Sequence, residues 1–313
     1  MVERRIRAFL DRLAARGGKP VEQLSLLEVR QLFADIQSGV SIDRARTEVV
    51  HRTISVDRGI VNLTVVRPAG AVGVLPAFMF FHGGGWIFGD FQTHERMVRD
   101  LVAESTTAAV CVDYDRSPEA RYPAAIRQAY AATRWVAEHG GEIGLDGRRL
   151  GIVGTGAGAN LGAVVSLMAK DRGAPVIAFQ VLFCPITNAV FDTASYEQFA
   201  EGHFLTRNMM KWFWASYTAD PRERLEVYAS PLRARTERLQ GVPPALILTA
   251  ELDVVRDEGE SYARELDRAG VDVTAIRYDG MIHDFALLNA LSDVPSARSA
   301  LLHASTQLKR RLH

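Results

Sequence analysis

The sequence predicts an α/β protein with a mainly parallel sheet that is covered by helices on both faces. Two observations support this prediction. Short apolar runs with strand character alternate with amphipathic segments from about residue 75 onward, and several of these runs end in glycine-rich or polar turns. For a chain of 313 residues, we expect one main domain with an added helical part.

The N-terminal part is predicted to be helical. Residues 2–38 have apolar positions at helical spacing, and Gly17-Gly18 divides them into two helices. We therefore assign residues 1–45 to a helical cap and residues 46–313 to the sheet-containing domain. From Thr47 the apolar pattern changes to a period of two, which predicts a pair of strands.

The remaining elements follow from the alternation. The apolar run at 75–81 is short enough for a buried strand, and further strand-like runs follow. The predicted later strands are TAAVCVDY, RRLGIVG, PVIAFQVLF, PPALILTA and VDVTAIRY. The predicted helices between and after them cover about 124–138, 157–170, 257–269 and 295–308.

The alternation is interrupted once, between Pro185 and Pro243. The inserted residues, about 186–230 in our assignment, contain many large apolar side chains and are too numerous for a simple crossover. Following a strand's carboxyl end, where open α/β sheets bind ligands, the insertion is predicted to cover a pocket together with the N-terminal helices. Additional hydrophobic core is the alternative interpretation.

Composition excludes several classes of protein. Lys+Arg and Asp+Glu both number 37, and no long block of like charge occurs, so neither nucleic acid nor an anionic membrane is an expected partner. The N-terminus lacks the apolar segment of a secretory signal, and no apolar run reaches about 18 residues. We expect a cytoplasmic protein that binds a small-molecule substrate. The oligomeric state is left open, and a homodimer is among the states allowed.

The two cysteines indicate neither a disulfide framework nor a metal site. Cys111 and Cys184 both lie in apolar runs and have no CxxC partner or nearby histidine in sequence. We expect two buried, reduced thiols, no metal and no cofactor.

A glycine-rich segment, HGGGW, directly follows the predicted strand at 75–81. Three consecutive glycines after a strand leave backbone N–H groups unobstructed, and such groups stabilise a carbonyl oxygen as it gains negative charge. An ordinary glycine turn is the alternative, but the preceding strand and His82 make it the weaker one.

A second segment, 151–158, reads GIVGTGAG and joins a predicted strand to a predicted helix. A G-x-S-x-G motif in this context would carry a nucleophilic serine, and the serine position here is Gly156. Thr155 precedes it, at the x position of such a motif, where the turn directs a side chain away from the histidine that would act with the serine. The segment also fits a dinucleotide-binding template, but the following strand lacks the acidic residue that holds the ribose.

Asp253 follows the strand PPALILTA, and His283 follows VDVTAIRY. A nucleophile turn, then an acid, then a histidine, each after a strand, is the chain order of a triad in α/β-hydrolases. An isolated Asp or His is usually structural. Four motifs in order, each on the appropriate element, are a strong indication of a catalytic site.

On these motifs the chain resembles the bacterial hormone-sensitive-lipase family of esterases. The resemblance covers nearly the whole chain, and the matching stretches are HGGGW (82–86), DYDRSPEARYPAA (113–125), GTGAGANLGA (154–163), AELDVVRDEG (250–259) and GMIHDF (280–285). It implies an α/β-hydrolase fold with a mostly parallel eight-stranded sheet, and a cap formed by the N-terminal helices and the insertion.

The resemblance also implies roles for individual residues. The N–H groups of Gly84, Gly85 and Ala157 would form the oxyanion hole, Asp253 would be the triad acid and His283 the base. The flanking aromatic residues Trp86 and Phe285 are our candidates for the lining of the substrate pocket.

The chain departs from the family pattern at several positions. Where the family has G-D-S-A-G-G-N, this chain has Thr155, Gly156 and Ala159 in place of Asp, Ser and the fourth Gly. The stretch at 113–119 differs from D-Y-R-L-A-P-E, and Asp284 replaces the usual Gly after the histidine. Several changes together favour natural divergence, with an engineered Ser-to-Gly exchange as the alternative.

Glycine cannot form an acyl-enzyme, so with Gly156 in place of the serine the sequence by itself favours a reaction other than serine-dependent ester hydrolysis. Our first expectation is a lyase, cyclase, dehydratase or isomerase in which His283, oriented by Asp253, acts as a general base. The alternatives are water-mediated ester or lactone hydrolysis without an acyl-enzyme, and an inactive ligand-binding pseudoenzyme. On this interpretation, ordinary carboxylesterase activity is not expected.

Overall fold

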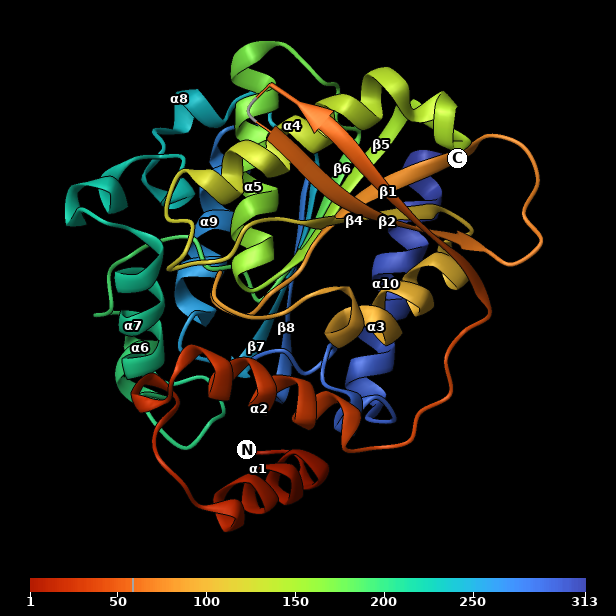
Figure 1. Cartoon of the computed structure of the whole chain (residues 1–313). Coiled ribbons are helices and arrows are strands. Elements are labelled where there is room, and N and C mark those ends of the chain that lie inside the picture. The colour runs from red at the N-terminus through yellow and green to blue at the C-terminus, as the bar shows by residue number, and fades with distance from the viewer. Residues whose placement is uncertain (58) are drawn as a thin grey trace.

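A single eight-stranded sheet forms the centre of the molecule, as Figure 1 shows for the computed structural model, which describes residues 1–57 and 59–313. The strands are β1 Thr47–Val56, β2 Gly59–Pro68, β3 Leu75–Phe81, β4 Ala108–Asp113, β5 Leu145–Thr155, β6 Phe179–Phe183, β7 Ala245–Leu252 and β8 Val273–Ile282. Their spatial order is β1-β2-β4-β3-β5-β6-β7-β8. The sheet predicted from the sequence is confirmed.

The sheet is antiparallel only at one edge. β1 pairs with β2, and β2 with β4, in antiparallel register, whereas every other neighbouring pair is parallel. Strands β3, β4, β6 and β7 consist mostly of buried residues because helices cover both faces. The carboxyl ends of β3, β5, β6, β7 and β8 therefore meet along one edge of the sheet.

Two helical layers enclose the sheet. The longer helices are α3 Phe91–Ser105, α4 Ala124–His139, α5 Ala157–Arg172, α9 Arg256–Arg268 and α10 Pro295–Leu312. Helices α3 and α10 contact each other on one face, and α4 and α5 contact each other on the opposite face (Figure 1).

The remaining helices lie mainly at the ends of the sheet. They are α1 Arg4–Arg16, α2 Leu26–Ser38, α6 Ala194–Gln198, α7 Arg207–Tyr217 and α8 Thr236–Leu239, with short 3₁₀ turns at Val21–Gln23, Gly140–Ile143, Pro221–Leu225, Pro231–Arg233 and Asn289–Leu291. α7 contacts the turn between α1 and α2, so the N-terminal helices and the insertion lie against each other.

One long helix, α3, is missing from the sequence-based prediction. Its apolar residues Met97, Val98, Leu101 and Val102 recur at helical spacing and are buried. Asp90 caps the helix, because its carboxylate accepts a hydrogen bond from the Thr93 N–H at 2.8 Å. Both signals are present in the sequence.

Two glycines allow α5 to start very close to the sheet. A Cβ at Gly158 would lie 1.9 Å from the carbonyl oxygen of Phe81, and one at Gly154 would lie 2.3 Å from the carbonyl oxygen of Gly158. Any side chain there would force the helix away from β3 and β5. These two glycines therefore fix the turn between β5 and α5 for steric reasons.

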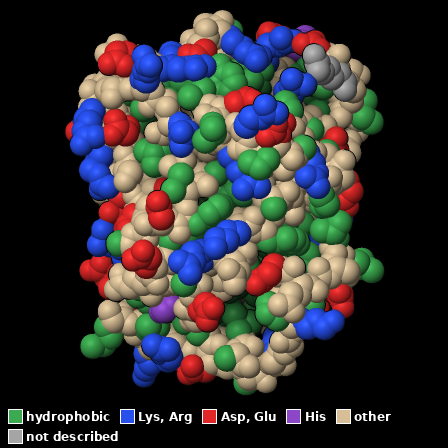
Figure 2. Space-filling model, turned by 90° about the vertical axis from the view of Figure 1, so that its left-hand side faces the viewer, with side chains coloured by type: hydrophobic (Ala, Val, Ile, Leu, Met, Phe, Trp, Pro, Cys, Tyr) green, Lys and Arg blue, Asp and Glu red, His purple; other side chains and the backbone are tan. Residues whose placement is uncertain are grey.

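Within residues 1–57 and 59–313, no helix combines the length and the apolar character needed to cross a bilayer. On the face drawn in Figure 2, side chains of Lys and Arg are interspersed with those of Asp and Glu. This agrees with the balanced charge of the sequence.

Candidate active site

The turn after β3 presents two free backbone amides. Gly84 and Gly85 have φ of 101° and 59°, in the left-handed region that favours glycine. No protein acceptor in residues 1–57 or 59–313 bonds to either N–H. The neighbouring Gly83 N–H donates to Nε2 of the buried His94 at 3.0 Å, which anchors the turn to α3.

Side chains at these two glycines would collide with their surroundings. A Cβ at Gly84 would lie 2.3 Å from the carbonyl oxygen of Phe88, and one at Gly85 would lie 2.4 Å from the ring of Phe213. The glycines are thus required both by backbone conformation and by packing.

Gly156 lies at the sharp turn between β5 and α5. Its φ of 52° and ψ of −113° are strained for any other residue type. A Cβ at Gly156 would lie 3.1 Å from Nε2 of His283, and among the described residues other than its chain neighbours the ring of this histidine is the only group within 4 Å. Ala157 begins α5, where first-turn N–H groups have no partner within the helix.

Asp253 and His283 form a buried pair at the carboxyl ends of β7 and β8. Nδ1 of His283 lies 2.8 Å from Oδ2 of Asp253, and the other carboxylate oxygen accepts a hydrogen bond from the Val255 N–H at 3.1 Å. Asp253 is fully buried and His283 is 6% exposed. The carboxylate therefore fixes the tautomer that leaves Nε2 free to accept a proton.

Burial lowers the pKa of the His283 imidazole, but the carboxylates of Asp253 and Asp284 outweigh this effect. The pKa consequently lies well above its ordinary value. The imidazolium formed by proton uptake is thus strongly stabilised in this site.

Cys184, at the end of β6, also approaches the pair. Donor atoms of Cys184, Asp253 and His283 all lie within 4.8 Å of one another, a set of ligand types that zinc accepts. However, burial raises the pKa of the Cys184 thiol to about 11, and two of the three donors already bond to each other. The geometry favours an Asp–His pair over a metal centre.

Two of the departures from the family pattern contact each other. The hydroxyl of Thr155 donates to Oδ1 of Asp284 at 2.7 Å, and the same oxygen lies 3.8 Å from Nε2 of His283. Asp284 is 8% exposed and has a φ of 58°. Both positions stand out in the sequence as departures from the family pattern, but nothing in the sequence indicates that they meet.

A small apolar pocket opens beside these groups. Its lining joins the glycine turn, α5, the insertion, α2 and the histidine loop, and consists of Phe33, Gly84, Gly85, Phe88, Ala157, Ile186, Phe204, Leu205, Met209, Phe213, His283 and Asp284. The predicted oxyanion residues therefore lie in one pocket with the predicted base. Asp284 is the one carboxylate in this lining.

Trp86 and Phe285, our candidates for the pocket lining, have different positions. Trp86 is fully buried and stacks on Tyr217, with ring centroids 4.2 Å apart. Phe285 is 1% exposed and packs against Tyr278. Neither residue lines the pocket, because adjacency in sequence to a site residue does not fix the direction of a side chain.

The loop that follows His283 is held in place by hydrogen bonds with side chains of α3 and α2. The buried guanidinium of Arg96 donates to the carbonyl oxygens of Ala286 and Leu287 at 2.5 and 2.9 Å and to Oδ1 of Asn289 at 2.9 Å. Gln37 accepts a hydrogen bond from the Asn289 N–H at 2.9 Å. These supporting residues belong to no recognisable motif, so the sequence does not reveal them.

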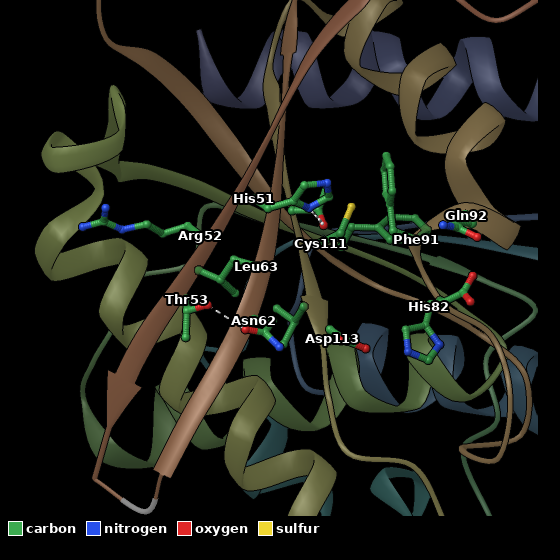
Figure 3. A pocket seen from close by; sticks show the side chains of 14 residues that line it. His51, Arg52, Thr53, Asn62, Leu63, His82, Phe91, Gln92, Cys111 and Asp113 are labelled. Atoms are coloured by element: carbon green, nitrogen blue, oxygen red, sulfur yellow. Dashed lines mark hydrogen bonds between the residues drawn. The ribbon is translucent and has the colours of Figure 1, made fainter.

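A larger cleft lies elsewhere, against β1, β2 and β4 (Figure 3). Its lining combines apolar side chains with polar ones, which include His51, Asp113 and the ring of His82. Burial lowers the pKa of His82 to about 4, so this imidazole is neutral. The cleft contains neither Asp253 nor His283, and we do not assign the reaction to it.

Comparison with known proteins identifies the family. A family model described as the alpha/beta hydrolase fold matches residues 78–287. This chain belongs to the α/β-hydrolase family. The α/β-hydrolase sheet expected from the resemblance is thus confirmed.

Several of the chain's relatives in this family are esterases. A thermostable esterase from Pseudomonas putida ECU1011 has 56% sequence identity and a TM-score of 0.99, over 100% of this chain and 98% of that one. Esterase LipI of Mycobacterium tuberculosis is 31% identical, over 93% of this chain and 94% of LipI. Carboxylesterase NlhH of the same organism is 37% identical, over 76% of this chain and 75% of NlhH.

These α/β-hydrolase relatives overturn our interpretation of the chemistry. From Gly156 we expected a lyase, cyclase or dehydratase, with hydrolysis without an acyl-enzyme or a pseudoenzyme as alternatives. Esterases that match this chain over 93 to 100% of its length point to ordinary ester hydrolysis. The interpretation was wrong because it let the residue at position 156 decide the reaction, although the Asp–His pair, the glycine turn and the resemblance over nearly the whole chain all matched esterases.

Proposed function

We propose that the site of this α/β-hydrolase is built for the hydrolysis of small, uncharged carboxylic esters, with position 156 as the nucleophile position. The observation that carries the proposal is the position of Nε2 of His283, 3.1 Å from a Cβ built at Gly156, while Nδ1 is held by Asp253 at 2.8 Å. This is the relation between nucleophile position, base and acid that ester hydrolysis requires.

The pocket supplies the electrophilic part of the reaction. An ester carbonyl oxygen would accept hydrogen bonds from the N–H groups of Gly84, Gly85 and Ala157, which face the same pocket as His283. Such donors are most effective for the negative charge that develops on the oxygen in the transition state, where water is excluded. The mostly apolar lining fits an uncharged acyl or alcohol group.

Position 156 is, in this proposal, the position of the nucleophile, and glycine provides no hydroxyl there. With a serine at 156, Oγ would attack the carbonyl carbon and pass its proton to Nε2 of His283. The histidine would return the proton to the departing alcohol, and a water molecule activated by the same histidine would then release the acid.

The test compares this chain with its Gly156→Ser and Gly156→Ala variants on p-nitrophenyl acetate. Loss of a nucleophilic serine costs on the order of 10⁶ in kcat, so we expect Gly156→Ser to raise turnover by about 10³-fold or more. The mass of the Gly156→Ser variant should increase by that of one phosphonyl group after treatment with a p-nitrophenyl phosphonate. Gly156→Ala, which adds a Cβ without a hydroxyl, is the matched control and should show neither change.

Two outcomes would contradict the proposal. A folded Gly156→Ser variant that is as inert as Gly156→Ala would show that position 156 is not the nucleophile position. Ester turnover that persists in the Gly156→Ser/His283→Ala double variant would show that His283 is not the base.

A further inference from the structure

The imidazole of His283 lies between two carboxylates, of which the proposed reaction uses one. Asp253 bonds to Nδ1, and Oδ1 of Asp284 lies 3.8 Å from Nε2, the nitrogen that must exchange protons during ester hydrolysis. At 3.8 Å the second carboxylate is beyond hydrogen-bonding distance of Nε2 but interacts strongly with its charge, because both groups are buried.

Thr155 fixes the second carboxylate in this position. Its hydroxyl donates to Oδ1 of Asp284 at 2.7 Å, and the Thr155 side chain is 1% exposed. The backbone contributes as well. Asp284 has a φ of 58°, a left-handed conformation that Asp adopts more readily than most residues, and the amides of Leu287 and Leu288 donate to its carbonyl oxygen at 2.8 and 2.9 Å.

We propose that Thr155 and Asp284 act as a pair of positioning residues that control the protonation of His283. Asp284 stabilises the imidazolium from the side of Nε2. Thr155 holds the carboxylate back, so that it does not bond directly to Nε2 and block the nitrogen that serves as the base. The inference rests on the proposed function, because it assigns this control to the catalytic base.

The groups that face His283 are few. Asp253 approaches from the end of β7, Cys184 from the end of β6, and Asp284 from the loop that carries the histidine itself. Cys184 is an uncharged thiol because burial raises its pKa to about 11. Asp253 and Asp284 therefore dominate the electrostatics of the ring, and of these two carboxylates Asp284 is the one beside Nε2.

Substitutions of the two residues are expected to change the pKa of His283 in opposite directions. Asp284→Asn keeps the shape and the tolerance for a left-handed backbone but removes the charge, so the pKa of His283 should fall by about one unit or more. Thr155→Val keeps the shape but removes the hydroxyl. The released carboxylate can then bond directly to Nε2, and the pKa of His283 should rise further.

The experiment has two independent measurements. The first follows the imidazole signals of His283 by NMR against pH in protein labelled at histidine, with His283→Ala to assign the signals; it requires no turnover. The second measures kcat/KM for p-nitrophenyl acetate against pH in the Gly156→Ser background. Since the neutral imidazole is the active base, activity is lost as pH falls below its pKa. Asp284→Asn should shift this acidic limb to lower pH and raise the relative activity there up to about tenfold per pKa unit.

Three controls make the test specific. Thr155→Ser retains the hydroxyl and should leave the titration of His283 unchanged. Asp267→Asn removes an exposed carboxylate and should have no effect. The Thr155→Val/Asp284→Asn double variant should titrate like Asp284→Asn alone, because Thr155 acts only through the carboxylate.

The inference is overturned if the titration of His283 does not move in either Asp284→Asn or Thr155→Val, or if both move it in the same direction. Because each variant tests the pair separately, misfolding of one leaves the other as a test. If the NMR titrations shift as expected but no variant turns over an ester, the proposed function fails while the control of His283 stands. If the variants turn over the ester but the titration of His283 does not shift, the proposed function stands and the inference about Thr155 and Asp284 fails.

Discussion

Asp253 and His283 lie 30 residues apart in the chain and share a single buried hydrogen bond. The fully buried carboxylate determines which ring nitrogen of His283 faces the pocket. At the scale of single residues, this bond and the free amides of Gly84 and Gly85 supply most of the chemistry that we propose.

The first prediction concerns the acid. In the Gly156→Ser background, Asp253→Asn should lower kcat for p-nitrophenyl acetate by about 10⁴-fold, because an amide stabilises the wrong tautomer of His283. Steady-state kinetics provide the measurement, and Asp267→Asn on the exposed side of α9 is the matched control. A loss of less than tenfold would remove Asp253 from the catalytic role.

The second prediction concerns the glycine turn. Gly84→Ala should abolish turnover in the same background, because the added Cβ would lie 2.3 Å from the carbonyl oxygen of Phe88 and displace the amide donors. Gly70→Ala is the control, since Gly70 also has a positive φ, of 70°, but has nothing within 4 Å of the added Cβ. Similar turnover in the two variants would show that the turn is not part of the oxyanion site.

At the residue level the sequence predicted the groups that belong to motifs. The positions of Gly84, Asp253 and His283 could be anticipated because each follows a strand that ends at the same edge of the sheet. The bond between Thr155 and Asp284 could not, since it depends on side-chain directions in two turns that lie 129 residues apart. The reaction predicted from Gly156 was wrong, because the absence of a serine hydroxyl does not by itself determine the chemistry for which the Asp–His pair and the amides of the glycine turn are arranged.

At the scale of secondary-structure elements, α3 is the support of the histidine loop. The strands and most helices were predictable from hydrophobic period, whereas α3 was overlooked although its apolar spacing is helical. Its most important side chain for the site, Arg96, is polar and buried. Hydrophobic patterns cannot indicate such a residue, because its partners are backbone carbonyls of a distant loop.

The third prediction tests this support. Arg96→Met should reduce the free energy of unfolding by about 3 kcal/mol. It leaves the buried carbonyl oxygen of Ala286 without a donor, and that of Leu287 keeps the bond from the Gln37 amide at 3.3 Å. Urea denaturation measures the change, and the exposed Arg298 on α10 provides the control variant Arg298→Met. A loss no larger than that of the control would show that the loop is held by its other contacts.

At the scale of the whole molecule, the pocket combines parts of the chain that are far apart. Phe33 comes from α2, Phe88 from the glycine turn and Phe213 from α7. The ring of Phe88 packs between the other two, with its centroid 4.9 Å from that of Phe33 and 5.7 Å from that of Phe213. The pocket size is therefore set jointly by the N-terminal helices and the insertion.

The fourth prediction follows from this packing. Phe213→Ala should enlarge the pocket and thereby favour the longer ester. The kcat/KM for p-nitrophenyl hexanoate, divided by that for p-nitrophenyl acetate, should rise by about tenfold or more, since each buried CH₂ contributes about 0.8 kcal/mol. Kinetics with both esters in the Gly156→Ser background give the ratio. Trp212→Ala, at the neighbouring position of α7, is the control because Trp212 does not line the pocket. An unchanged ratio in Phe213→Ala would place the acyl group elsewhere.

The order of strands in the sheet has a consequence for refolding kinetics. The glycine turn, the β5–α5 turn, Asp253 and His283 follow four different parallel strands, β3, β5, β7 and β8. Pairing of such strands closes long loops and is slow compared with helix formation. Recovery of phosphonate labelling in the Gly156→Ser variant, followed after dilution from denaturant, should therefore lag behind the return of the helical circular dichroism signal, and would report completion of the sheet.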